Sequence, residues 1–346
     1  MKFTFNKQFM VLMFLLLNCF ASYAANEYLL TKQITLKLTE AGTLPNKIAS
    51  SEKNLVTNLK IIGEINGTDL RFIREMAGCD VEGYRTSGIL SVLDLSEARF
   101  VAGGDNYYYS CYTSNDIIGK YAFCGCSSLT SVIIPSSVTE IEKYAFWGCS
   151  SLINVNISSS VTEIGEDAFE NCSSLTSVNI PSSVTSIGMY AFKDCSSLTS
   201  VNIPSSVTEI GKDAFKDCSS LTSVNIPSSV TKIESGTFAR CSGLKSIYVY
   251  AETVPSIGTG AFNGFDSENC TLYLPKGTYD AYRYSWGYYF DNIVEFDATN
   301  IRNIVAEPEV QENARYAVNG QRLTAPVKGI NLVKYNNGRV KKEIVK

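Results

Sequence analysis

A repeat of 23 residues occupies the middle of the chain and restricts its possible folds more than any other feature. Segments 172–194 and 195–217 differ at only three positions, so the period is not accidental. A unit this short cannot bury its own apolar side chains, and it therefore predicts coils that stack and cover one another. Six cysteines mark the period: Cys126, Cys149, Cys172, Cys195, Cys218 and Cys241.

Each unit has about eight apolar residues that we expect to face inward. The alternation over residues 200–203 predicts a short strand, with Asn202 facing outward. Pro204 then turns the chain, and Gly211 permits a bend. The inward positions in this unit are Leu198, Val201, Ile203, Val207, Ile210, Ala214, Phe215 and Cys218.

The unit L-x-x-V-x-I-P-x-x-V-x-x-I-G-x-x-A-F-x-x-C resembles the BspA-like class of bacterial leucine-rich repeats. This resemblance implies a leucine-rich repeat solenoid, α/β but mostly β, with a parallel sheet on its concave face. It also implies an N-terminal cap at 25–85, a repeat array at 86–265 and a C-terminal cap at 266–300. Within the first cap, residues 59–76 predict a strand and a helix with a Thr or Asp cap. Known members are described as adhesins that bind host matrix proteins or other cells.

The first 24 residues have the pattern of a secretory signal peptide. Two lysines precede an apolar stretch at 9–20, and small residues suit cleavage after Ala24. A lipoprotein anchored through Cys19 and a buried N-terminal helix are two further interpretations. No later stretch is apolar enough to cross a membrane. We expect a secreted or cell-surface protein with no membrane span in the mature chain, and attachment to the outer membrane stays open.

The last segment, 301–346, is basic, with nine Lys or Arg against four Glu. Turns at 319–320 and 336–338 separate three predicted strands at 315–318, 330–334 and 340–345. The segment resembles the C-terminal tail of proteins that use a type-nine sorting signal. A small β segment with no role in export is the second interpretation.

The chain contains no histidine, which excludes Ser-His-Asp and Cys-His catalysis and the HExxH metal site. Its net charge of −4, without a basic stripe, argues against nucleic-acid binding. We therefore predict that the protein is not an enzyme. No catalytic, cofactor-binding or metal-ligating residue is predicted, and no cofactor.

The periodic cysteines are predicted to be free thiols. Equivalent residues of stacked coils lie about 4.8 Å apart, whereas a disulfide needs Cβ atoms about 3.5–4.5 Å apart. Four further cysteines lie outside the column, and a bridge between two of them, Cys111 and Cys124, stays open. The four are Cys79, Cys111, Cys124 and Cys270.

Outward strand positions and an inserted loop at 101–115 supply the candidate partner-binding residues. The outward columns offer amide donors and acceptors in a row, although neighbouring amides could also simply bond to each other. Aromatic residues serve as interface anchors, and those at 279–290 either pack a cap or form a binding platform. The candidates are Asn156, Asn179, Asn202, Asn225, Tyr248, Tyr107, Tyr108 and Tyr109.

Two classes of function are consistent with these features. The first is a non-enzymatic extracellular binding protein, an adhesin or interaction scaffold, whose partner is a host matrix protein or another cell surface. The second is a secreted protein that binds or processes glycans. A hydrolase would need paired carboxylates about 5–10 Å apart, whereas Glu140, Glu163 and Glu209 are predicted to be solvated positions on a regular rod.

Overall fold

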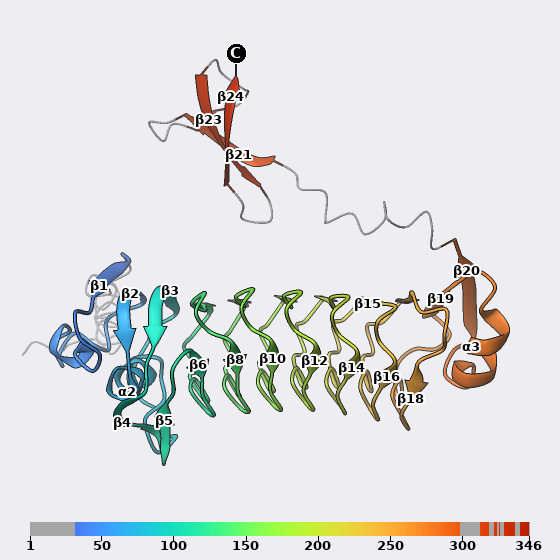
Figure 1. Cartoon of the computed structure of the whole chain (residues 1–346), viewed down its shortest axis with the longest axis horizontal. Coiled ribbons are helices and arrows are strands. Elements are labelled where there is room, and N and C mark those ends of the chain that lie inside the picture. Colours follow the sequence, from blue (N-terminus) through green and yellow to red (C-terminus); the bar gives the residue numbers. More distant parts are fainter. Residues whose placement is uncertain are drawn as a thin grey trace, which may run out of the picture. The chain divides into compact units, whose positions relative to one another are not determined.

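We describe a computed structural model of the chain (Figure 1). The structure describes residues 32–297 and, in the C-terminal segment, 312–317, 322–323, 325, 329–335 and 340–345. The predicted signal peptide and the two turns of the tail lie outside these residues. The chain divides into two compact units, Met1–Phe296 and Asp297–Lys346, which we treat separately.

A ladder of parallel strands runs along the first unit, and successive coils each add one strand to it (Figure 1). Its strands form two sheets in chain order, the first ending at β9 and the second beginning at β11. Within each sheet the repeat is in register, so that Ser177, Ser200 and Ser223 are aligned. The strands are β1 (Ile34–Lys37), β2 (Asn58–Ile65), β3 (Val92–Phe100), β7 (Ser131–Ile133), β9 (Asn154–Asn156), β11 (Ser177–Asn179), β13 (Ser200–Asn202), β15 (Ser223–Ile226), β17 (Ser246–Val249), β19 (Thr271–Pro275) and β20 (Asn292–Phe296).

A second parallel ladder, which the sequence analysis did not assign as a sheet, runs along another side of the coils. Each strand has two residues and contributes one inward isoleucine, as the apolar pattern predicted, and this isoleucine is buried in every strand except β18, where it is partly buried. The strands are β6 (Ile117–Ile118), β8 (Glu140–Ile141), β10 (Glu163–Ile164), β12 (Ser186–Ile187), β14 (Glu209–Ile210), β16 (Lys232–Ile233) and β18 (Ser256–Ile257). Gly211 does not supply a left-handed bend here. A Cβ atom on Gly211 would lie 2.7 Å from the carbonyl carbon of Gly188 in the preceding coil. Glycine at this position therefore allows the backbones of the two coils to approach closely.

The interior of the array is a stack of phenylalanine rings, each at most 1% exposed. Neighbouring ring centroids are 5.0–5.5 Å apart, and the rings are nearly parallel. This spacing is close to the strand separation of about 4.8 Å, so each ring covers the ring of the coil before it. The rings belong to Phe123, Phe146, Phe169, Phe192, Phe215, Phe238 and Phe262.

The cysteine column packs beside these rings, and all ten cysteines in the described residues are free. The Cys149 thiol donates to the carbonyl of Phe123 in the preceding coil at 3.0 Å, and the next four cysteines of the column repeat this bond at 3.1–3.3 Å. Burial raises the pKa of Cys126 and Cys241 to about 12, which keeps these thiols protonated at neutral pH. The column of free thiols is therefore present as predicted. Cys111 and Cys124, for which the sequence left a disulfide possible, are not bridged.

The N-terminal end of the array is covered by η1 (Leu44–Asn46) and α2 (Gly67–Met76). Asn66, not Thr68 or Asp69 as predicted, is the N-cap of α2, and its side chain accepts from the backbone N–H of Thr68 at 3.0 Å. Arg74 is fully buried and donates to the carbonyl of Tyr121 at 2.7 Å. This bond joins α2 to the first coil.

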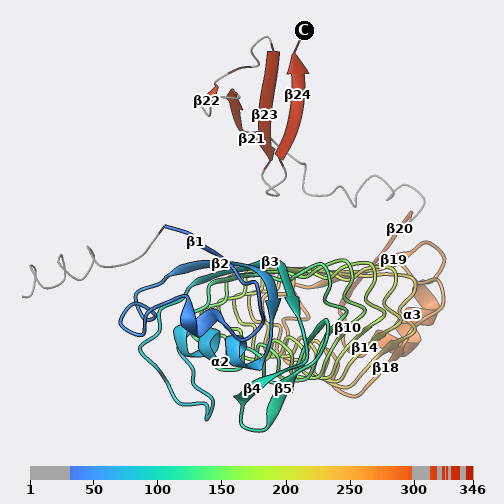
Figure 2. The same cartoon turned by 60° about the vertical axis from the view of Figure 1, so that its left-hand side comes forward.

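The insertion at 101–115 forms a hairpin of β4 (Gly103–Tyr108) and β5 (Cys111–Thr113), which lies beside α2 (Figure 2). At the other end, α3 (Tyr279–Trp286) packs on the last coil, where the Trp286 and Phe290 rings contact Phe262. None of the helices in the described part of the chain is long and apolar enough to span a membrane.

The second unit contains an antiparallel sheet in the order β22-β21-β23-β24. The three strands predicted from the sequence are present, and a short fourth strand joins them. A role of this segment in export stays a prediction. The strands are β21 (Glu312–Ala317), β22 (Arg322–Leu323), β23 (Gly329–Tyr335) and β24 (Val340–Val345).

We predict that Phe215→Ala lowers the free energy of unfolding by about 3–5 kcal/mol, because it removes a ring that is covered on both sides. Tyr284→Ala is the matched control, since that ring is 96% exposed and its loss leaves no cavity. Denaturant unfolding monitored by circular dichroism measures both changes. A Phe215 variant as stable as the control variant would contradict the stacked core.

Candidate binding surface

Two columns of outward side chains lie side by side along the strands, and we call them the strand face. The parallel pairing aligns each column, with Asn179, Asn202 and Asn225 in register from β11 to β15. The first column is Ser131, Asn154, Ser177, Ser200, Ser223 and Ser246, and the second is Ile133, Asn156, Asn179, Asn202, Asn225 and Tyr248.

The asparagines of the second column are available to a partner. Asn156, Asn179 and Asn202 are exposed, and Asn225 is half-buried. Within the described residues, none of these four side chains forms a hydrogen bond, so they do not bond to each other. The strand face does contain one such bond elsewhere, in which the Ser131 hydroxyl donates to Asn154 Oδ1 at 2.8 Å.

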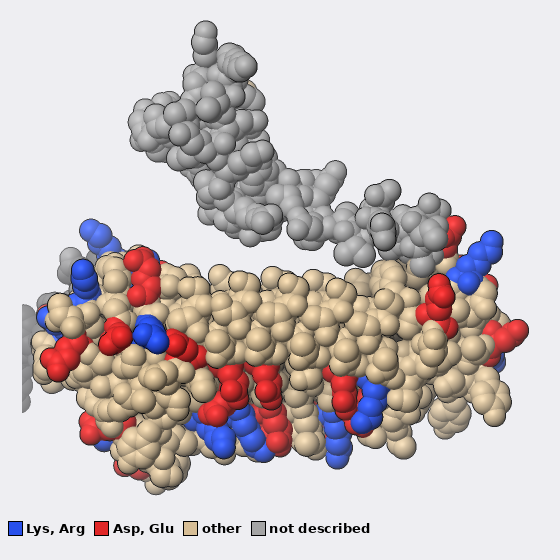
Figure 3. Space-filling view, in the orientation of Figure 1, with Lys and Arg blue, Asp and Glu red and all other residues tan. Residues whose placement is uncertain are grey.

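The strand face carries no charge over its central coils. Segments 173–185, 196–208 and 219–231 contain no Lys, Arg, Asp or Glu, and Figure 3 shows a band without charged residues along the array. Charge begins near the first strands, where Lys60 Nζ lies 2.7 Å from a carboxylate oxygen of Glu97. A partner on the central coils would therefore meet hydroxyl, amide and methyl groups.

An aromatic pair closes the asparagine column at its C-terminal end. Tyr248 is half-buried, and its ring stacks on that of Tyr273 in the next strand, with the centroids 4.4 Å apart. Sequence reasoning missed Tyr273, although the Leu-Tyr-Leu pattern at 272–274 repeats the alternation of β17 and could have identified it.

The three hairpin tyrosines predicted to bind a partner differ in their exposure. Tyr107 is 1% exposed, and its hydroxyl donates to the carbonyl of Lys120 at 2.8 Å, so it belongs to the core and is withdrawn as a binding residue. Tyr108 is half-buried and stacks on Tyr121, with the centroids 5.2 Å apart. Tyr109 is 60% exposed and remains a candidate. The register of the hairpin decides which ring turns inward, and the sequence alone did not reveal it.

The aromatic residues at 279–290 divide in the same way. Tyr282, Trp286 and Phe290 are buried against the last coil and pack the end of the array. Tyr284 and Tyr288 are more than 90% exposed and do not pack this end, so a binding platform stays a prediction for these two rings.

A carboxyl pair, which sequence reasoning did not anticipate, lies at a corner of the coil that contains β10. Asp167 and Glu170 are both nearly buried. Glu170 accepts from Trp147 Nε1 at 2.8 Å and from Lys193 Nζ at 2.5 Å. Desolvation alone would raise the pKa of Glu170, but these donors lower it. Desolvation, followed by the hydrogen bond and charge of Glu170, raises the pKa of Asp167 to about 7.

The repeat carboxylates do not form a comparable pair. Glu140 and Glu163 are aligned in β8 and β10, and Glu209 in β14 is aligned with Lys232. Glu163 and Glu209 are exposed, whereas Glu140 is half-buried, and desolvation and neighbouring carboxylates raise its pKa. Stacking of equivalent coils, not a shared pocket, brings these groups together.

The parallel solenoid, its 23-residue register and its inward Leu, Val, Ile and Phe residues define a leucine-rich repeat protein. Six copies of the BspA type Leucine rich repeat region match the chain at residues 108–219, 163–288 and 208–323. The chain therefore belongs to the family of BspA type leucine-rich repeat proteins. These proteins are typically secreted or surface-associated, are involved in binding, and are generally not enzymes.

Solved bacterial leucine-rich repeat proteins are similar to this chain. The Leucine Rich Repeat protein of T. pallidum is 35% identical over 49% of this chain and 77% of its own, with a TM-score of 0.42. A leucine-rich repeat protein from Bacteroides ovatus is 24% identical over 56% of this chain and 58% of its own, with a TM-score of 0.34. A comparison with curated proteins gives no match.

We predict that Asp167→Asn stabilises the protein more at pH 8 than at pH 5. The pKa of this carboxyl rises from 3.8 to about 7 on folding, so wild-type stability falls as the pH rises between these values. An asparagine cannot ionise, tolerates the positive φ of 55° at this position and keeps a donor toward Glu170. Thermal unfolding of both proteins across this pH range measures the difference.

Asp213→Asn is the matched control for this experiment. Asp213 occupies the same corner two coils later, but it faces Lys216 Nζ at 3.5 Å and not a second carboxylate. Its replacement is expected to give no stabilisation at pH 8. Equal pH dependence in the two variants would contradict the raised pKa of Asp167 beside Glu170.

Proposed function

We propose that the protein is a non-enzymatic extracellular binding protein and that the strand face is the surface on which a protein partner docks. The single observation that carries this proposal is the row of exposed or half-buried asparagines whose side chains have no hydrogen-bond partner, from Asn156 to Asn225. Each unpaired amide offers a donor and an acceptor to a partner, and the paired strands hold the backbone of the row in register. These hydrogen bonds must outweigh the entropy that the asparagine side chains lose on binding.

The absence of charge restricts the kind of partner. A surface of hydroxyl, amide and methyl groups recognises a partner through hydrogen bonds and apolar contacts. Such binding depends little on ionic strength, because there are few charges to screen. We propose a host matrix protein or a protein of another cell surface as the partner, in keeping with the typical location of the family.

Export of the chain is part of the same proposal. The signal-peptide pattern at 1–24 supports secretion or display at the cell surface. Ten buried or half-buried free thiols are compatible with that location, because the column cysteines are protonated and covered by neighbouring coils.

We predict that the double variant Asn179→Ala/Asn202→Ala binds its partner about tenfold more weakly, as expected for the loss of two hydrogen bonds. Its melting temperature should hardly change, because these side chains form no hydrogen bond within the chain. Binding is measured on immobilised collagen, laminin and fibronectin, each at low and high salt.

Glu163→Ala/Lys212→Ala is the matched control, since both side chains are exposed and lie outside the strand face. This variant should bind like the wild type. If the asparagine variant loses stability while each folded molecule binds as before, the column is structural and the proposal is wrong.

A further inference from the structure

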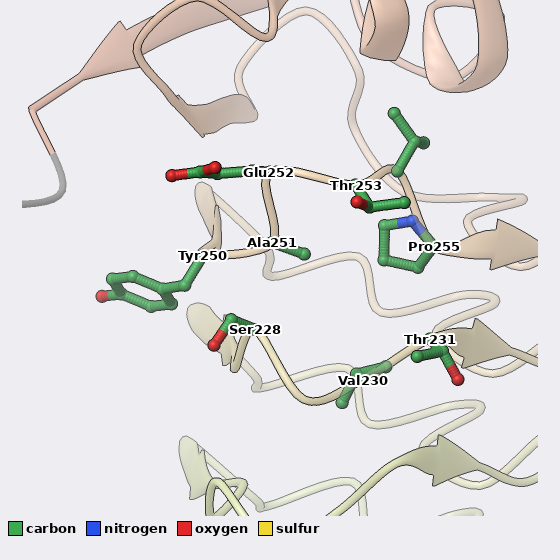
Figure 4. A pocket seen from close by; sticks show the side chains of 9 residues that line it. Ser228, Val230, Thr231, Tyr250, Ala251, Glu252, Thr253 and Pro255 are labelled. Atoms are coloured by element: carbon green, nitrogen blue, oxygen red, sulfur yellow. The ribbon is translucent and has the colours of Figure 1, made fainter.

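The coil that follows β17 departs from the 23-residue period, and a hollow lies beside it. Ile226 pairs with Val249, an offset of 23 residues, whereas Lys232 pairs with Ser256, an offset of 24. The extra residue therefore lies in the loop 250–255, between the two ladders. The hollow beside this loop has a volume of about 430 Å³ (Figure 4), which is within the usual range for small-molecule sites.

The loop is held open by the C-terminal helix. The buried hydroxyl of Tyr282 donates to the carbonyl of Ala251 at 2.7 Å, and Trp286 Nε1 donates to the carbonyl of Pro255 at 3.2 Å. Both ends of the loop are thus fixed from α3. In the regular coil below, by contrast, Ser229 donates to the carbonyl of Val207 at 2.7 Å and closes the loop onto its neighbour. The pocket is therefore preorganised.

The lining is rich in polar groups that have no partner within the chain. Among the described residues, the side chains of Ser228, Glu252 and Thr253 are exposed and form no hydrogen bond or ion pair, so they are free to bond to a ligand. Tyr250 is half-buried, and the edge-to-face contact of its ring with Phe296, 5.7 Å between centroids, fixes its position. Figure 4 shows the Tyr250 and Glu252 side chains projecting to the same side of the loop.

We propose that this pocket binds a neutral sugar, a pyranose ring alone or at the end of a glycan. The C–H face of a pyranose is apolar and suits the Tyr250 ring, and its hydroxyls can donate to the Glu252 carboxylate, an acceptor of strong hydrogen bonds. Ser228 and Thr253 can both donate and accept, as sugar hydroxyls do. Half-buried Val254 supplies an apolar contact in the lining.

Other ligand classes fit the lining less well. The lining contains a carboxylate but no Lys or Arg, which disfavours an anionic ligand. A cationic amine could form an ion pair with Glu252. One tyrosine ring does not form an aromatic cage, however, and the hydroxyls of Ser228 and Thr253 would form no hydrogen bond with such a ligand. The sugar site is independent of the strand face, so either proposal can fail without the other.

The test is saturation-transfer NMR followed by calorimetry on the full chain, with methyl glucoside, methyl galactoside, methyl mannoside and N-acetylglucosamine as probes. We expect saturable binding of at least one of them. Sialic acid and choline are the anionic and cationic comparisons. Glu252→Gln should weaken binding about tenfold, which corresponds to about 1.4 kcal/mol. Tyr250→Ala should abolish it, whereas Tyr250→Phe, which keeps the ring, should retain most of it.

Glu163→Gln and Tyr284→Ala are the matched controls, because they make the same changes at exposed positions outside the pocket lining. Both should bind like the wild type. The proposal is overturned if no neutral sugar binds, if choline or sialic acid binds more tightly than every neutral sugar, or if the pocket variants and the controls lose affinity equally. Circular dichroism of each variant separates loss of binding from loss of folding.

Discussion

Contact between equivalent residues of successive coils is the interaction on which the whole array depends. The phenylalanine rings are stacked 5.0–5.5 Å apart, and each later cysteine of the column bonds to the carbonyl of the preceding coil. Because every inward position touches its own copy, the side chain at that position must pack well against itself. A small thiol and a flat ring meet this condition, and a change of period would move every column out of register at once.

The same physics explains how much the sequence could predict. The parallel register and the inward-facing side chains of each coil, such as Phe215, follow from periodicity alone. The repeat shows which residues of successive coils are equivalent. The second ladder was missed as a sheet, since two-residue strands have too little alternation to recognise. Three features depend on contacts outside the repeat, and the period therefore could not predict them. They are the burial of Tyr107, the Asn66 cap and the pocket at 250–255.

Regular and irregular parts of the solenoid would serve different kinds of recognition. Identical coils produce long rows, such as the asparagines from Asn156 to Asn225, that suit an extended partner. A concave site needs a departure from the period, and the one-residue insertion between Val249 and Ser256 provides it. The carboxyl pair at Asp167 and Glu170 shows a third consequence. The position of Asp167 is occupied by Tyr190 and Asp213 in the next two coils. Substitution at this corner thus changes the local charge and the pKa of a carboxyl without disturbing the fold.

Removal of one complete period tests the central role of coil-to-coil contact most directly. Deletion of residues 195–217 brings Cys218 onto the coil below in the register that Cys195 had, and all inward columns remain continuous. Circular dichroism during thermal unfolding should then show a β-rich protein with one cooperative transition. Deletion of 195–205, which breaks the period, should abolish that transition. If both deletions unfold the chain equally, or if neither does, stacking of equivalent residues is not what holds the array together.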